Sequence, residues 1–191
     1  LKTEGWQEFA QIVTAFYQNI AQKSSSRYII DSSKSIAWAK LLSLLPDLNV
    51  KFIHLERDLV QVANSWKKDI ILPEYPDGNV KMPKKSNLLI LRTALKIRLM
   101  IRSFSREREL YYISYEALCA KPKEELLMLE AYLDDKLPNR LISHPTHAIG
   151  GNPMRDQLNE LKIKPAAVRT DLLSSVEVLL FEVSKGIIKL I

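Results

Sequence analysis

Short apolar runs that alternate with longer amphipathic segments are the feature that most constrains how this chain folds. Residues 28–30 form an apolar run without polar alternation, which is typical of a strand buried on both faces. Residues 50–55 and 110–114 are the second and third predicted strands. Helical periodicity predicts helices over about 4–22, 32–45, 58–68, 87–102, where leucines share one face, and 122–133. Ser174 and Glu177 form a capping-box pattern that predicts a last helix from residue 174 onward. This alternation predicts an α/β fold, a parallel sheet covered by helices, in a single domain over residues 1–191.

The composition is that of a globular protein. Hydrophobic residues make up 47% and charged residues 26%, which excludes a disordered tail, a collagen-like fibre and a disulfide-stapled miniprotein. The 28 basic and 22 acidic side chains give a net charge of 28 − 22 = +6, which is compatible with anionic partners. Cys119 has no second cysteine to pair with, so we expect a reducing, cytoplasmic location. No apolar run reaches the roughly 18 residues of a membrane span.

The carboxyl end of the second predicted strand carries a candidate anion site. In a parallel sheet, ligands bind where strand ends meet the following helices. Arg57 follows the strand, and Ser65 comes eight residues later, about two helical turns along. The helix N-terminus, a guanidinium and a hydroxyl are all suited to phosphate oxygens. The alternative is a capped helix whose Arg57 makes a surface ion pair.

Polar residues also follow the first predicted strand. Asp31 and Lys34 lie within the sequence Asp-Ser-Ser-Lys directly after residues 28–30. They place a carboxylate and an ammonium where a substrate would lie. The alternative is that this segment only caps the next helix.

A third candidate segment contains paired glycines. Gly150 and Gly151 let the backbone approach a ligand closely, and Asn152 and Arg155 add hydrogen-bond donors. A glycine turn with solvent-facing polar groups is the alternative. The three histidines and one cysteine show no metal-ligand spacing, so we expect no metal. Basic and aromatic residues are not interleaved, so we expect no nucleic-acid partner.

Taken in order, four segments resemble the sulfotransferase family over about residues 27–191: the three that follow the predicted strands and the one with the paired glycines. The stretch that ends in Arg57 and Ser65 resembles the family's 3′-phosphate-binding motif, a strand ending in Arg with Ser eight positions later. The segment around Tyr115 is similar to the family's "YEDL" segment, whose tyrosine lies near the adenine. Residues 147–155 are similar to the "H-x-I-x-G-N-x-x-R" loop of bacterial-type members.

The resemblance implies a P-loop-NTPase-like fold and transfer of a sulfuryl group from 3′-phosphoadenosine-5′-phosphosulfate (PAPS) to a hydroxyl or amine. Arg57, Ser65, Asn152 and Arg155 would hold the 3′-phosphate, and Tyr115 would lie near the adenine. The acceptor would be a small molecule, a glycan or a lipid, and PAPS chemistry needs no metal.

The general base implied by the resemblance follows the first predicted strand. Many cytosolic members have a histidine there, and this chain has Asp31 in that region. Asp31 is therefore the candidate base, and Lys34 the candidate cation beside the transferring group. A helix-capping or structural carboxylate at Asp31 is the alternative.

One departure from the family is the lack of a Gly- and Lys-containing loop for the 5′-phosphosulfate. We expect the first strand, loop and helix to lie upstream of Leu1, so that this N-terminally truncated segment is inactive by itself. Two alternatives stay open: a nucleotide kinase with related topology, and a non-catalytic nucleotide-binding or scaffold domain of the same fold.

Overall fold

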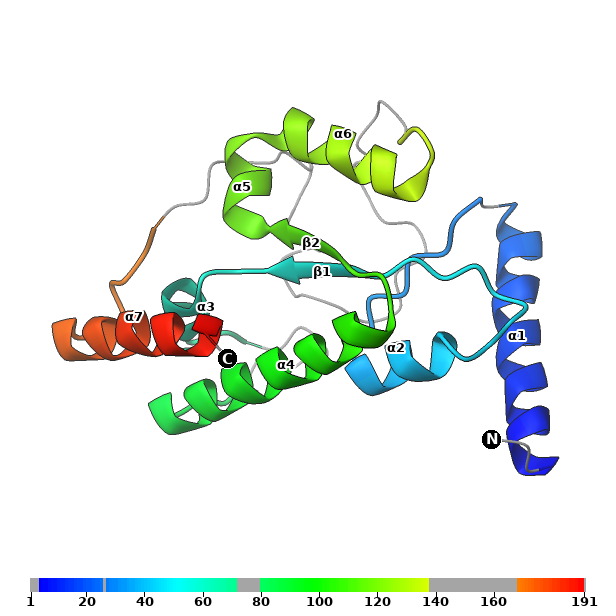
Figure 1. The fold of residues 1–191 in the computed structure, drawn as a ribbon. Helices are drawn as coiled ribbons and strands as arrows, with labels where there is room; N and C mark the ends of the chain where they lie inside the picture. The colour runs from blue at the N-terminus through cyan, green and yellow to red at the C-terminus, as the bar shows by residue number, and fades with distance from the viewer. Residues whose placement is uncertain (1–3, 26, 72–79, 138–167, 191) are drawn as a thin grey trace. The chain divides into compact units, whose positions relative to one another are not determined.

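The computed structural model describes residues 4–25, 27–71, 80–137 and 168–190. The described residues of Leu1–Phe52 and Met100–Leu110 form one compact unit, the first unit. Those of Ile53–Leu99 and Tyr111–Ile191 form the second unit. The elements, labelled in Figure 1, are α1 (Glu4–Ser24), α2 (Ile36–Leu42), β1 (Ile53–Glu56), α3 (Leu59–Trp66), α4 (Asn87–Glu107), β2 (Tyr111–Ser114), α5 (Tyr115–Ala120), α6 (Pro122–Leu133) and α7 (Ser175–Leu190).

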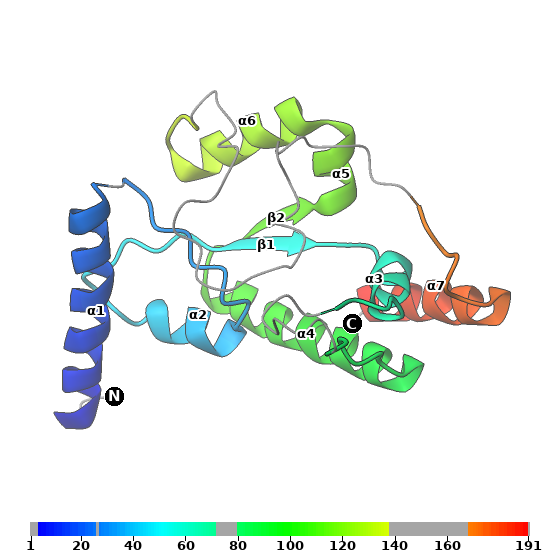
Figure 2. The same cartoon turned by 180° about the vertical axis from the view of Figure 1, so that it is seen from behind.

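A two-stranded parallel sheet lies in the second unit. β1 pairs with β2 in a register that runs from Ile53 opposite Tyr111 to Glu56 opposite Ser114. Figures 1 and 2 show the two strands side by side from opposite sides. The structure therefore confirms the mixed α/β character and the parallel pairing of the second and third predicted strands. Because the strands are parallel, the residues after Glu56 and Ser114 leave the sheet at the same end.

The prediction of a buried strand at residues 28–30 is wrong. These residues are not in a strand, and their side chains are 47%, 36% and 90% exposed. An extended segment becomes a strand only when its backbone N–H and C=O groups form hydrogen bonds with those of a neighbouring strand. No strand pairs with residues 28–30 in the part of the chain that the structure describes.

Several helices follow the sequence pattern closely. α1 spans the predicted amphipathic segment, and α6 begins at Pro122 as predicted, because a proline at the first helical position loses no hydrogen bond. α2 is shorter than the predicted 32–45, since Ser35 caps it and its hydroxyl accepts the Trp38 N–H at 3.2 Å. The preceding residues are therefore outside the helix.

The two units have separate apolar cores. In the first unit, Val13 of α1 packs with Leu42 and Leu45. In the second unit, α3 packs against α7 and the start of α4 through Val60, Ala63, Ile90 and Phe181, which are 0–3% exposed. Burying a side chain such as that of Phe181 stabilises a fold by roughly 1.5–3 kcal/mol. The prediction of one domain stays a prediction.

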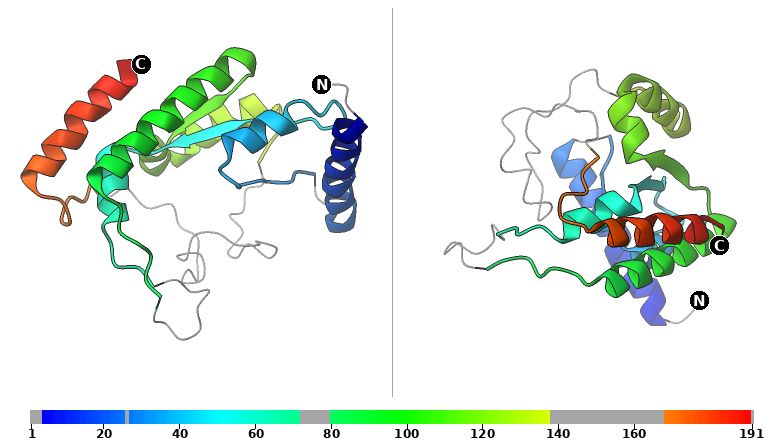
Figure 3. Two further views of the ribbon diagram at one scale, coloured as in Figure 1. Left: turned by 90° about the horizontal axis from the view of Figure 1, so that it is seen from below. Right: turned by 90° about the vertical axis from the view of Figure 1, so that its left-hand side faces the viewer.

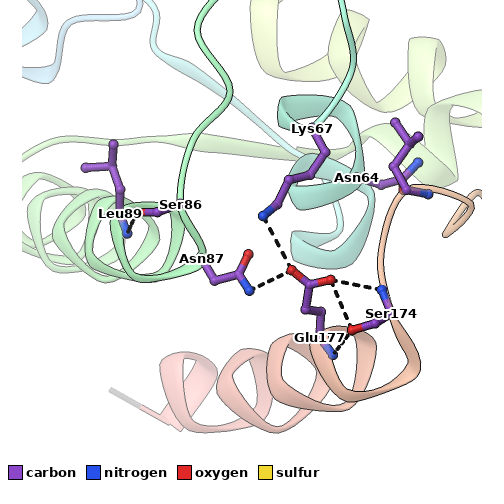
Figure 4. A network of polar contacts seen from close by, with 8 residues as sticks. Asn64, Lys67, Ser86, Asn87, Leu89, Ser174 and Glu177 are labelled. Atoms are coloured by element: carbon purple, nitrogen blue, oxygen red, sulfur yellow. Dashed lines mark hydrogen bonds and ion pairs between the residues drawn. The ribbon is translucent and has the colours of Figure 1, made fainter.

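Glu177 joins the three helices of the second unit's core. The predicted capping box is confirmed: the Ser174 N–H donates to Glu177 Oε2 at 2.9 Å, and the Glu177 N–H donates to Ser174 Oγ at 3.3 Å. Glu177 Oε1 accepts from Asn87 Nδ2 at 2.8 Å and from Lys67 Nζ at 3.4 Å (Figure 4). These bonds lower the pKa of the Glu177 carboxyl to about 2, the Ser174 N–H contributing most.

This lowered pKa predicts a pH dependence of stability. Above the unfolded-state pKa of about 4.3, the ionised Glu177 stabilises the fold fully. The contribution is lost as pH falls from there through the folded-state pKa of about 2. We expect Glu177→Gln to lower the urea midpoint of unfolding at pH 6, and the gap from wild type to close toward pH 2. A gap that stays constant with pH would contradict the assignment.

Candidate functional site

Arg57 and Tyr115 meet at the carboxyl end of the sheet. Each residue directly follows one of the two paired strands, and the parallel register brings them together from 58 positions apart. The Arg57 guanidinium carbon lies 4.9 Å from the centroid of the Tyr115 ring, within the range of a cation–π contact. The structure thus brings together two of the residues that the sequence assigned to one site.

The guanidinium of Arg57 has no carboxylate partner among the described residues. Arg57 is exposed, and none of the salt bridges in that part of the chain includes it. The described residues therefore do not form the surface ion pair that was the alternative for Arg57. The hydrogen-bond donors of a permanently charged group remain available to an anion.

The N-terminus of α3 already has a carboxylate bound to it. Asp58 Oδ1 accepts the N–H groups of Val60 at 2.9 Å and Gln61 at 3.3 Å, and Oδ2 lies 2.8 Å from Lys185 Nζ. Burial raises the pKa of Asp58, but the bonds from Lys185 and the two N–H groups outweigh it and lower the pKa. The capped-helix alternative is thus right for α3, and an external anion cannot use these two N–H groups while Asp58 holds them.

Sequence reasoning missed the role of Glu116. Its Oε1 accepts the backbone N–H of Asp58 at 3.0 Å, and its Oε2 accepts the hydroxyl of Ser114 at 3.1 Å. One carboxylate therefore links the end of β1 to the end of β2. The helix α5, which begins at Tyr115, was not predicted either. The sequence signal for it is Ser114, a residue type that commonly caps helices, and its hydroxyl accepts the Ala117 N–H at 3.3 Å.

The Tyr115 phenol is held in its neutral form. A hydrogen bond with the buried Cys119 raises the pKa of Tyr115 most, and burial raises it further, while the charge of Arg57 lowers it. The net shift is upward from an ordinary value near 10, so the ring carries no charge at neutral pH. A neutral ring is what a purine or a guanidinium packs against.

Ser65 lies on α3 as predicted, but not beside the helix start. It is half-buried in the last turn, about 9 Å along the helix axis from Leu59. The Arg57 side chain therefore has to lie along α3 for one phosphate to contact both groups. In the structure the guanidinium lies over Tyr115 instead.

Asp31, the candidate base, is bound by three donors within the first unit. Tyr17 Oη and Trp38 Nε1 donate to Oδ2, the latter at 2.9 Å, and the Ser33 N–H donates to Oδ1 at 2.8 Å. Burial raises the pKa of Asp31, but these hydrogen bonds outweigh it, led by that of Tyr17, and the pKa is lowered. A lowered pKa makes the carboxylate a weaker base, and Ser35, not Asp31, caps α2.

Lys34, the candidate cation, is exposed and has a backbone φ of 60°. That left-handed conformation costs a residue with a Cβ atom roughly 1–2 kcal/mol. The strained turn lies directly before Ser35, so it sets the direction in which the chain enters α2.

The remaining predicted site residues, Asn152 and Arg155, lie outside the described residues, as does the glycine pair before them. Within the described ranges, no three His, Cys, Asp or Glu side chains are grouped so that they could hold a metal ion. Of the helices that the structure describes, none has both the length and the apolar character needed to cross a membrane.

The cluster around Asp31 gives a testable pKa prediction. Tyr17→Phe removes the hydroxyl that donates to Asp31, so we expect the pKa of Asp31 to rise, measured by NMR titration of its carboxyl carbon. Tyr112→Phe removes a hydroxyl outside this cluster and serves as the control. An Asp31 pKa that stays the same in Tyr17→Phe would show that this bond does not set it.

Comparison with known proteins adds nothing to this geometry. No family model, no curated protein and no solved structure matches the chain.

Proposed function

We propose that this protein is a PAPS-dependent sulfotransferase with a P-loop-NTPase-like fold, which transfers a sulfuryl group to a hydroxyl or amine acceptor. The observation that supports the proposal best is the contact between Arg57 and Tyr115 at the end of a parallel strand pair. A 3′-phosphoadenosine carries a phosphate next to a purine nucleoside. A permanently charged fork beside a neutral aromatic ring offers one group to each part.

The Arg57 guanidinium would bind the phosphate. Among the described residues Arg57 contacts a ring rather than a carboxylate, so an incoming phosphate has no ion pair to displace there. Arginine binds phosphate through two parallel N–H donors, which fixes the ligand's orientation as well as its position. Ser65, in the last turn of α3, would contact the same phosphate only if Arg57 leaves the Tyr115 ring, so we assign the phosphate first to Arg57.

The chemical step needs in-line positioning, a neutralised leaving phosphate and a base for the acceptor. We assign the base to Asp31 and a supporting cation to Lys34. An ionised carboxylate has about four lone-pair sites, two on each oxygen. The described donors already occupy most of these sites, so the acceptor's hydroxyl or amine would take the place of one of them on Asp31.

Binding of adenosine 3′,5′-bisphosphate tests the anion site. Calorimetry on the complete chain should show binding that Arg57→Ala weakens by about tenfold to a hundredfold, because a charge-assisted contact contributes roughly 1.5–3 kcal/mol. Arg106→Ala, which removes an exposed arginine of α4, is the matched control and should bind like wild type. Equal affinities for Arg57→Ala and Arg106→Ala would exclude this site.

Measuring sulfuryl transfer tests the role of Asp31 as the base. In the full-length protein, with labelled PAPS and a panel of hydroxyl and amine acceptors, Asp31→Asn should abolish transfer and leave bisphosphate affinity nearly unchanged, because an amide cannot take the proton. Asp47→Asn, at an exposed carboxylate of the same unit, should transfer at the wild-type rate. Retained transfer by Asp31→Asn would remove its assignment as base. A strict Mg²⁺ requirement would point to a kinase, and binding without transfer to a non-catalytic domain.

A further inference from the structure

We propose that Glu116 is a positioning residue that holds the Arg57 guanidinium against the Tyr115 ring. Its two carboxylate oxygens accept one bond from each strand end, from the Asp58 N–H at 3.0 Å and from the Ser114 hydroxyl at 3.1 Å. Asp58 is the neighbour of Arg57, and Ser114 and Glu116 flank Tyr115. The carboxylate therefore closes a bridge between the two backbones from which the contacting side chains extend.

The strands alone do not fix this contact. The parallel ladder ends with Glu56 opposite Ser114, so Arg57 and Tyr115 lie one residue beyond the last paired position. Beyond that point the two segments enter different helices, α3 and α5. Glu116 joins these two segments beyond the last paired residues of the ladder.

The bridge depends on hydrogen bonds rather than on charge. Glu116 accepts both of its bonds from neutral donors, an amide and a hydroxyl. A glutamine at this position keeps an amide oxygen for the Asp58 N–H and can donate to the Ser114 oxygen, whereas an alanine keeps neither bond. Glu116→Gln and Glu116→Ala remove the same charge and differ mainly in whether the bridge can form.

The first test needs no ligand. In NMR spectra of the complete chain we expect nuclear Overhauser effects between the Arg57 side chain and the Tyr115 ring in wild type and in Glu116→Gln, and their loss in Glu116→Ala. Glu109→Ala, which removes an exposed glutamate elsewhere, should keep them. Contacts that persist in Glu116→Ala, or that are lost equally in Glu116→Gln, would overturn the proposal. If Glu116→Ala does not fold, Glu116→Asp takes its place, since the shorter side chain cannot span both donors.

The second test rests on the proposed function. We expect Glu116→Ala to bind adenosine 3′,5′-bisphosphate about tenfold more weakly than Glu116→Gln, the equivalent of two neutral hydrogen bonds. In an Arg57→Ala background that difference should disappear, because Glu116 acts through Arg57. A difference that persists there would show a general structural effect and overturn the positioning role. If wild type binds no bisphosphate, the proposed function fails, while the NMR comparison still decides the role of Glu116.

Discussion

The parallel register of β1 and β2 is the constraint on which the candidate site depends. It aligns Glu56 with Ser114, and so delivers Arg57 and Tyr115 to the same end of the sheet from 58 residues apart. Side chains alternate between faces along a strand, so a shift of one residue would reverse the face of every side chain on one strand. This pairing brings the guanidinium and the ring near each other, and the Glu116 bridge beyond the last paired residues joins the two segments that carry the 4.9 Å contact.

Acidic side chains at the ends of helices and strands join elements that the two-stranded sheet does not connect. In the second unit, Asp58 caps α3 and pairs with Lys185 of α7, and Glu116 links the two strand ends. Glu177 caps α7 and binds α3 and α4 (Figure 4). Each carboxylate accepts several bonds at once, which is possible because an ionised carboxylate has only acceptor sites. Residues 66–71 and 80–85 lie side by side (Figure 3), joined by backbone bonds such as Met82 N–H to Ile70 O at 2.7 Å and by the Asp69 carboxylate, which lies 2.8 Å from Lys84 Nζ.

The sequence predicted the elements whose signals are local. Pro122 marked the start of α6, the Ser174–Glu177 pair marked the start of α7, and leucine spacing marked α4, although that helix continues to Glu107, beyond the expected residue 102. Prediction failed where a partner decides the outcome. Residues 28–30 have the composition of a buried strand, but a strand exists only with a paired neighbour.

For the site, the sequence by itself determined which chemical groups are present: a guanidinium after β1, a phenol after β2 and a carboxylate at Asp31. Only the tertiary structure decided what those groups contact, since the contacts join residues far apart in the chain. It placed Arg57 over Tyr115 and surrounded Asp31 with Tyr17 and Trp38. Spacing along a chain fixes which groups are near each other within one helix or turn, whereas contacts between elements depend on strand register and core packing, which no local pattern encodes.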